Sequence, residues 1–322
     1  MKKIMALVLI AGLGVSGCSP HFHLTFLATE KLQESILLAS AAREKIVVID
    51  VSGTISAEPE PGLLKRGSDM VAGIYAQLDR AAGDRQVRGI ILRLDTPGGE
   101  VTASDILYHE IRRFKERTGI PVLTLMMGIA ASGGYYLAMA SDWLVAHPTT
   151  ITGSIGVIAV LPSVQGLLDK VGIQMQVIKS GELKGSGSPY QTLNDAGRAQ
   201  YQNLIDGHYQ RFLRVVEEGR GRLIAPAKMT EVADGRIFSA AQALELKLID
   251  EIGYFDAALK RILSLAKIPA ARVVSYTHFP LKKTNIYAQA DSSSPLTPGL
   301  KRLEDIGASL KSGFYYLWLP GD

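Results

Sequence analysis

One serine, Ser132, stands where its hydroxyl could do chemistry. It lies in the run Ala-Ala-Ser-Gly-Gly of residues 130–134, where an apolar strand-like stretch passes into a helix-like one. A hydroxyl at such a turn lies beside backbone N–H groups without intrahelical partners and at the positive end of a helix dipole. This position suits a nucleophile and the binding of an oxyanion. It also suits a plain helix N-cap, so Ser132 by itself leaves both interpretations open.

Three further segments bear on this choice. Residues 95–101 (Asp-Thr-Pro-Gly-Gly-Glu-Val) carry two adjacent glycines directly after a predicted strand. Such glycines let the backbone approach a substrate and turn its N–H groups toward it, although the same residues also make an ordinary turn. Residues 152–157 form a loop of small residues after another strand, and residues 179–189 place lysines among Gly and Ser.

A serine nucleophile needs a base, and no recognisable motif places a His–Asp pair here. A Ser–Lys dyad is the natural alternative. A lysine amine, with a reference pKa of about 10.4, acts as a general base only where burial or a like charge lowers that value toward ~7–8. Lys179 and Lys184 are both candidates, and the residues alone do not choose between them.

Alternating strands and helices must position these segments. Apolar runs predict strands at residues 46–51, 88–94, 121–127, 143–146 and 174–178. Helical spacing predicts helices at residues 67–83, 102–117, 162–172, 194–219, 239–247 and 255–266. This alternation predicts an α/β fold of βαβ units with a largely parallel sheet.

The composition is that of a packed globular protein. The 322 residues are 47% hydrophobic and 20% charged, with a net charge of +4. There is no basic block, so we expect no nucleic-acid partner. The six histidines are scattered and form no zinc-binding motif, so we expect no metal site and no cofactor.

Residues 1–18 are typical of an export signal. Two lysines precede a short apolar stretch, and small residues lead to Cys18, the single cysteine of the chain. This pattern resembles a bacterial lipoprotein box, in which Cys18 would carry the lipid that anchors the protein to a membrane. We therefore expect a lipid-anchored protein of the bacterial cell envelope, with a tether at residues 19–43 and an extracytoplasmic catalytic domain at residues 44–268.

The end of the chain is predicted to be an extension, residues 269–322. Residues 291–299 are rich in Ser and Pro and read as a linker, and an aromatic cluster follows at residues 314–319. That cluster is compatible with packing on the body, contact with a membrane or partner, or occupation of the substrate groove. The sequence does not decide the role of residues 276–322.

Residues 95–101, 131–138 and 152–157 and the Lys184 loop, in this order and spacing, resemble the signal peptide peptidase A family of serine peptidases. The resemblance runs from about residue 46 to about residue 265 and includes the blocks 234–239 and 243–253. It implies a crotonase- and Clp-protease-like α/β spiral. It also implies a homo-oligomeric ring facing the membrane, in whose short form the dyad is completed across a subunit boundary.

The resemblance assigns roles residue by residue. Ser132 is the nucleophile and Lys184 the general base, the backbone N–H groups of Gly99 and Gly133 form the oxyanion hole, and Ser154 orients the lysine. The implied function is a serine endopeptidase that cleaves apolar peptides, such as signal-peptide remnants or misfolded membrane-associated peptides.

The chain departs from the family pattern at a few positions. Leu183 stands where Tyr is frequent, and Ala240 and Lys247 stand where Gly is usual; none of these changes removes a reacting group. Two alternatives remain. One is a non-catalytic scaffold or partner-binding homologue, which the presence of Ser132 and Lys184 disfavours. The other is a crotonase-like acyl-CoA enzyme. Such an enzyme would need paired catalytic carboxylates, which cannot be identified in this chain, and CoA, which an exported protein would not meet.

Overall fold

The computed structural model describes residues 32–58, 69–224, 226–277, 283, 285–287 and 313–319. The predicted signal with Cys18, most of the tether and the 291–299 linker lie outside these residues. The described helices are α2 (Met70–Gly83), α3 (Val101–Thr118), α4 (Gly133–Ala138), α5 (Gln165–Lys170), α6 (Asp195–Arg220), α7 (Pro226–Val232), α8 (Ala240–Glu245) and α9 (Phe255–Leu265). The described strands are β1 (Gln33–Leu38), β2 (Lys45–Ser52), β3 (Val87–Thr96), β4 (Gly98–Glu100), β5 (Val122–Ala131), β6 (Trp143–Ala146), β7 (Ile151–Gly153), β8 (Ile158–Val160), β9 (Ile237–Ser239), β10 (Glu251–Ile252), β11 (Arg272–Thr277) and β12 (Gly313–Leu317).

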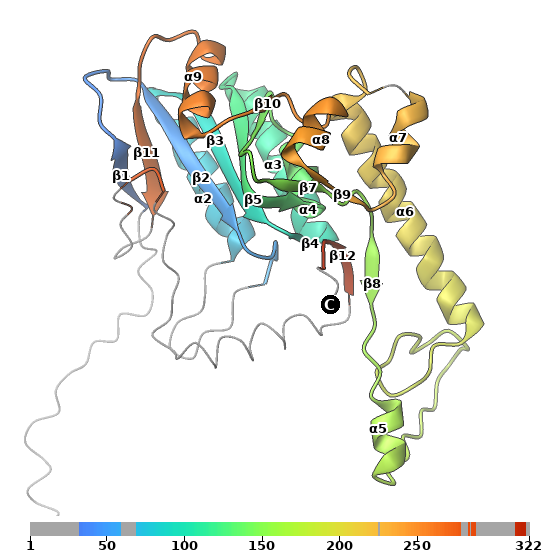
Figure 1. The fold of residues 1–322 in the computed structure, drawn as a ribbon. Coiled ribbons are helices and arrows are strands. Elements are labelled where there is room, and N and C mark those ends of the chain that lie inside the picture. Colours follow the sequence, from blue (N-terminus) through green and yellow to red (C-terminus); the bar gives the residue numbers. More distant parts are fainter. Residues whose placement is uncertain are drawn as a thin grey trace, which may run out of the picture. The chain divides into compact units, whose positions relative to one another are not determined.

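A largely parallel sheet forms the centre of the fold (Figure 1). Its main path is β1-β11-β2-β3-β5-β6-β10, and all neighbours on this path are parallel except β1 and β11. β7 extends β5 in parallel and pairs with β9 in antiparallel orientation. The predicted α/β class with a largely parallel sheet is therefore confirmed.

Helices cover both faces of this sheet, which explains why its central strands are almost wholly apolar. In β2, Val47 and Ile49 point into a core shared with α2, α3 and α4, whereas Ile46 and Val48 point into a second core under α9. Figure 1 shows α9 on the face opposite α2 and α3. Because successive side chains of a strand point to opposite faces, β2 contributes to a hydrophobic layer on each side of the sheet.

Most predicted elements form within a few residues of their expected ends, with two exceptions. Residues 33–38, within the segment expected to be a tether, form β1 and pair with β11 at the edge of the sheet. Residues 174–178, expected to be a strand, form no strand. Their apolar side chains are exposed, including Ile178 at 100%, and no strand among the described residues pairs with their backbone groups.

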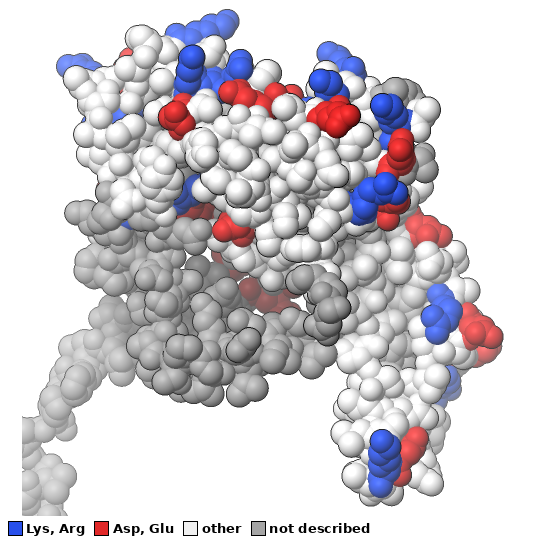
Figure 2. All heavy atoms as spheres, in the orientation of Figure 1, with Lys and Arg blue, Asp and Glu red and all other residues white. Residues whose placement is uncertain are grey.

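Residues 161–193, here called the arm, join β8 to α6 and carry α5. All of them are described, and none has a buried side chain. Figure 1 shows α5 at the end of a segment that extends away from the sheet. Several apolar side chains of the arm are exposed, and the visible part of its surface is mostly uncharged (Figure 2). Within the described ranges, no helix combines the length and apolarity needed to cross a bilayer.

A second, three-stranded sheet lies beside the first, in the order β4-β12-β8. β12 comes from the aromatic cluster near the end of the chain and is antiparallel to both neighbours. It therefore places residues 313–317 next to the glycines of β4.

Candidate active site

Ser132 lies at the junction between β5 and α4, as the sequence predicts. Its side chain is only 1% exposed, and its backbone angles are φ 51° and ψ −113°. A positive φ with this ψ lies outside the left-handed region that non-glycine residues occasionally adopt. Residues held in such sparsely populated conformations cluster at functional sites. The turn thus has the strained strand-to-helix geometry that presents a nucleophilic serine.

The hydroxyl of Ser132 does not cap the helix that it precedes. The residue occupies the N-cap position of α4, but its side chain makes no capping hydrogen bond. Its backbone is fixed instead: the Ser132 N–H donates to the Gly153 carbonyl at 2.8 Å, and the Tyr136 N–H donates to the Ser132 carbonyl at 2.8 Å. The alternative that Ser132 serves only as a helix N-cap is therefore not supported by its side chain.

Gly133 and Gly134 permit the close packing that surrounds this turn. A Cβ on Gly134 would lie 2.7 Å from Cγ2 of Thr96, and one on Gly133 would lie 2.6 Å from the hydroxyl oxygen of Ser104. Both distances are shorter than real Cβ contacts. The start of α4 can thus lie directly against the end of β3 only because these residues lack side chains.

Strand β4, which follows β3, presents the backbone of Gly99. The Ile55 N–H donates to the Gly98 carbonyl at 2.8 Å, and the Glu100 N–H donates to the Ile55 carbonyl at 2.8 Å. Because peptide groups alternate along an extended strand, the N–H and carbonyl of Gly99 face the opposite side. β12 lies on that side, with Tyr316 opposite Gly99.

Ser154 lies close to Ser132 in the structure. It follows Gly153, whose carbonyl accepts the Ser132 N–H, and its own N–H donates to the Arg236 carbonyl at 2.8 Å. Ser154 is 7% exposed and also has a positive φ, 51°. β7 therefore brings Ser154 next to the β5–α4 junction, together with Gly99 and Gly133.

Neither candidate lysine joins this group within the single chain. Lys184 and Lys179 are both exposed on the arm, and Lys179 donates to the Glu182 carbonyl at 2.6 Å. Within the described part of the single chain, neither candidate lysine therefore contacts Ser132 through a hydrogen bond or an ion pair.

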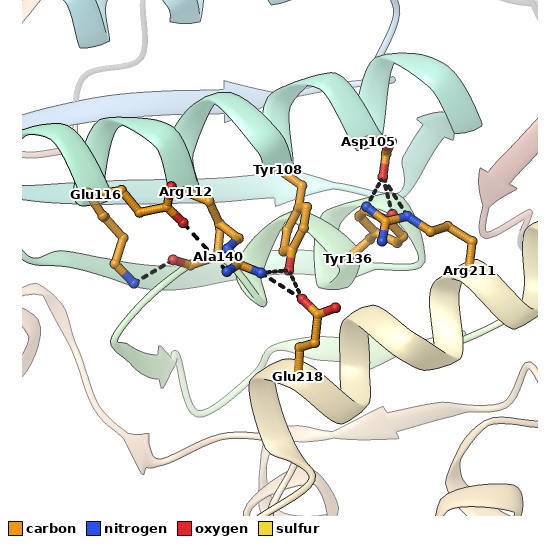
Figure 3. A network of polar contacts seen from close by, with 9 residues as sticks. Asp105, Tyr108, Arg112, Glu116, Tyr136, Ala140, Arg211 and Glu218 are labelled. Carbon is orange, nitrogen blue, oxygen red and sulfur yellow. Dashed lines mark hydrogen bonds and ion pairs between the residues drawn. The ribbon is translucent and has the colours of Figure 1, made fainter.

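An aromatic and ionic network under α4 was not anticipated from the sequence (Figure 3). The Tyr136 hydroxyl donates to Asp105 on α3, and Arg211 on α6 donates to the same carboxylate at 2.8 Å. A second junction joins Tyr108 on α3 to Glu218 on α6 at 3.0 Å. Burial, and then the carboxylate of Asp105, raise the pKa of the Tyr136 hydroxyl, so it stays a hydrogen-bond donor at neutral pH. The network fixes α3, α4 and α6 to one another.

The strain at Ser132 has a measurable consequence for stability. Ser132→Gly is expected to raise the free energy of unfolding by about 1 kcal/mol relative to Ser132→Ala. Relief of about 1–3 kcal/mol of backbone strain exceeds the entropic cost of glycine, about 0.5–1 kcal/mol. Urea unfolding of the two variants tests this prediction, and equal stabilities would contradict a strained turn.

Comparisons with known proteins match both halves of the described body. The model of Peptidase family S49 matches residues 114–269, and that of Clp protease matches residues 63–150. A relative from Enterococcus faecium, which carries the name signal peptide peptidase SppA, is 35% identical over 78% of this chain and 72% of its own length. A Synechocystis protein named as a protease is 35% identical over 73% of this chain and 79% of its own. Protease 4 of Haemophilus influenzae is 33% identical over 67% of this chain, which corresponds to 34% of that longer protein.

Proposed function

Because this chain belongs to peptidase family S49 and is a serine endopeptidase, we propose that Ser132 is its nucleophile and Lys184 its general base. The observation that carries the proposal is the strained, buried Ser132 at the β5–α4 junction, whose hydroxyl does not cap the helix. The positions of Gly99, Gly133 and Ser154 near Ser132 support the further roles that the family resemblance implies for them.

In the proposed reaction, the Ser132 oxygen attacks the carbonyl carbon of the scissile peptide bond while Lys184 accepts the serine proton. The backbone N–H groups of Gly99 and Gly133 stabilise the negative charge on the carbonyl oxygen. The C–N bond then breaks, the proton passes to the leaving amine, and an ester joins the substrate to Ser132. Water attacks this ester with Lys184 again as base, which releases the carboxylate and restores the hydroxyl.

We propose that Lys184 acts on Ser132 of a neighbouring subunit. In the single chain Lys184 is exposed, and the arm that carries it has no buried side chain. The arm also exposes Leu167, Val171, Ile173, Met175 and Val177, each to at least 45%. Packing of this apolar surface on a second copy would bury it and bring the lysine into a site poor in water, where an amine can act as a base. The unpaired segment 174–178 would then gain a strand partner.

The proposed substrates are extended apolar peptides such as signal-peptide remnants or misfolded membrane-associated peptides, cleaved at the surface of a membrane. The name of the Enterococcus relative supports this choice. We further propose a homo-oligomeric ring, anchored through lipid on Cys18 with the catalytic domain outside the cytoplasm. The non-catalytic scaffold is not favoured, because the related proteins are named as proteases.

A fluorophosphonate, which phosphonylates activated serines, tests the proposed nucleophile. The full chain in detergent is expected to gain one label, which peptide mass mapping assigns to Ser132, and Ser132→Ala is expected to gain none. Ser275→Ala is a matched control, because Ser275 is fully buried on β11 and its hydroxyl has no hydrogen-bond partner among the described residues. Undiminished labelling of Ser132→Ala would contradict the assignment.

A further inference from the structure

Helix α6 joins the arm to the body, and it is buried mainly over its last third. Gly197 is the only buried residue in its first half, and the atoms nearest to it include those of Ser186 and Leu193 of the arm. The other buried residues of the helix are Phe212, Val215, Val216 and Arg220. Between Asp195 and Arg211 the helix rises about 24 Å. α6 is therefore a lever with its buried end in the body and its exposed end in the arm.

The exposed end of α6 holds the loop that carries Lys184. The Tyr201 hydroxyl donates to the Ser186 carbonyl at 3.1 Å, and the Ser186 N–H donates to the Leu183 carbonyl at 3.0 Å. A tilt of α6 is thus transmitted to the candidate base. Over ~24 Å, a tilt of about 10° moves the end of the helix by about 4 Å. This displacement exceeds the whole length of the hydrogen bond, ~2.6–3.2 Å, through which a general base must act.

Two ion pairs fix the buried end of α6 to α3 (Figure 3). Arg211 donates to Asp105 at 2.8 Å, and Arg112 donates to Glu218 at 2.6 Å. The two partners on each helix are separated by seven residues, which is about two turns along one face. Tyr108 joins the second pair, because its hydroxyl accepts from Arg112 and donates to Glu218. We call the two ion pairs the clamp.

The order of charges in the clamp admits one register. Along α3 the acidic Asp105 precedes the basic Arg112, whereas along α6 the basic Arg211 precedes the acidic Glu218. A shift of α6 by two turns would place two acidic or two basic side chains opposite each other, and a smaller shift would break both pairs. The apolar contacts that bury this end of α6 have no such directionality.

The clamp is better suited to fixing direction than to adding stability. Its four side chains are 37–49% exposed, and exposed ion pairs contribute little to the free energy of unfolding. Asp105 also accepts from Tyr136, whose N–H donates to the Ser132 carbonyl. The clamp therefore joins the arm of a subunit to the helix that follows its own Ser132.

We propose that the clamp holds α6 at the angle at which the arm brings Lys184 to Ser132 of a neighbouring subunit. Asp105, Arg112, Arg211 and Glu218 are then positioning residues, since each acts through α6. The inference rests on the proposed function, in which Lys184 serves a neighbouring site. It assigns a catalytic effect to residues on the α3–α6 contact.

Assemblies of two variants test on which subunit the clamp acts. A base donor, Ser132→Ala, and a nucleophile donor, Lys184→Ala, are co-expressed with different tags and purified through both. Only arms of the base donor then support activity. Glu218→Arg in the base donor is expected to lower kcat about 10²-fold, since misplacement of a reacting group by ~1 Å has an effect of that order. In the nucleophile donor it should change kcat by less than about twofold. An equal loss from both placements, or no loss from either, would overturn the proposal.

A charge swap tests the pairing itself. Arg112→Glu alone in the base donor should lower kcat as much as Glu218→Arg alone. The two together restore an opposite-charge pair and are expected to return kcat to within about threefold of the unmodified base donor. Glu217→Arg is the matched control, because it makes the same change at the next exposed residue of α6, outside the clamp, and should leave kcat unchanged. A folded swap variant that regains no activity would overturn the role of the pair.

A distance measurement separates this inference from the proposed function. Two exposed residues, His109 on α3 and Lys170 on α5, are replaced by spin-labelled Cys in the full chain with Cys18→Ser. Double electron–electron resonance then gives the distribution of distances between body and arm. Glu218→Arg is expected to shift or broaden this distribution, and the swap to restore it.

An unchanged distribution would overturn the inference alone, even where mixed assemblies show that Lys184 serves a neighbour. A distribution that responds to Glu218→Arg, while no mixed assembly regains activity, would support the fixing of the arm by the clamp. That result would overturn only the assignment of the base.

Discussion

Ser132→Ala is expected to lower kcat/KM for an apolar fluorogenic peptide by about 10⁴-fold or more. The variant keeps the backbone hydrogen bonds that fix the turn, namely those with Gly153 and Tyr136. It loses only the attacking oxygen, and no other group on the β5–α4 junction replaces it. Rates for purified full-length protein in detergent, measured beside the parent, give the comparison.

The matched control for this prediction is again Ser275→Ala, which removes a buried hydroxyl on a distant strand. Its activity should remain close to that of the parent. Circular dichroism should show the same fold in both variants. A folded Ser132→Ala protein that retains a tenth or more of the parent activity would show that another residue is the nucleophile.

Lys184→Ala is expected to be about 10²- to 10⁴-fold less active than the parent, which is the range that a general base contributes. Combining this variant with Ser132→Ala in one assembly is expected to restore part of the activity. When Lys184→Ala and Ser132→Ala are co-expressed with different tags and purified through both, activity should return to about a quarter of the parent value, since random neighbours pair an intact Ser132 with an intact Lys184 in one site of four.

Lys179→Ala serves as the control for the base, because it removes a second exposed lysine of the same arm. It should leave most of the activity in place. Mixed assemblies that remain as inactive as the two single variants would contradict a base supplied by a neighbouring subunit. Loss of activity in Lys179→Ala, with Lys184→Ala unaffected, would assign the base to the other candidate.

The sequence predicts the central sheet well, because its signals are local. The buried runs around Val48, Ile91 and Leu123 are continuous and apolar, and they form β2, β3 and β5. The small residues around Ser132 likewise predict the strand-to-helix turn. What the sequence does not supply is the backbone strain of this turn, which is visible only in the φ of 51° and ψ of −113° at Ser132.

Features that depend on distant partners are not predicted. Residues 174–178 have the composition of a strand, but no strand of the described part of the chain pairs with them. β1 forms because β11, more than 200 residues later, offers an edge. The sequence analysis names the aromatic cluster at residues 314–319 and leaves its role open. Only the register of β12 brings Tyr316 opposite Gly99 and against the aromatic rings of α4 and α6.

The exposed arm has a consequence for how activity depends on amount of protein. In the proposed mechanism, a copy that meets no other copy has Ser132 without its base, and we expect it to be inactive toward peptides. Specific activity should then rise with concentration and fall on dilution, as the assemblies form and dissociate. Newly made chains would then be inactive as monomers and would become active peptidases only where they accumulate and assemble.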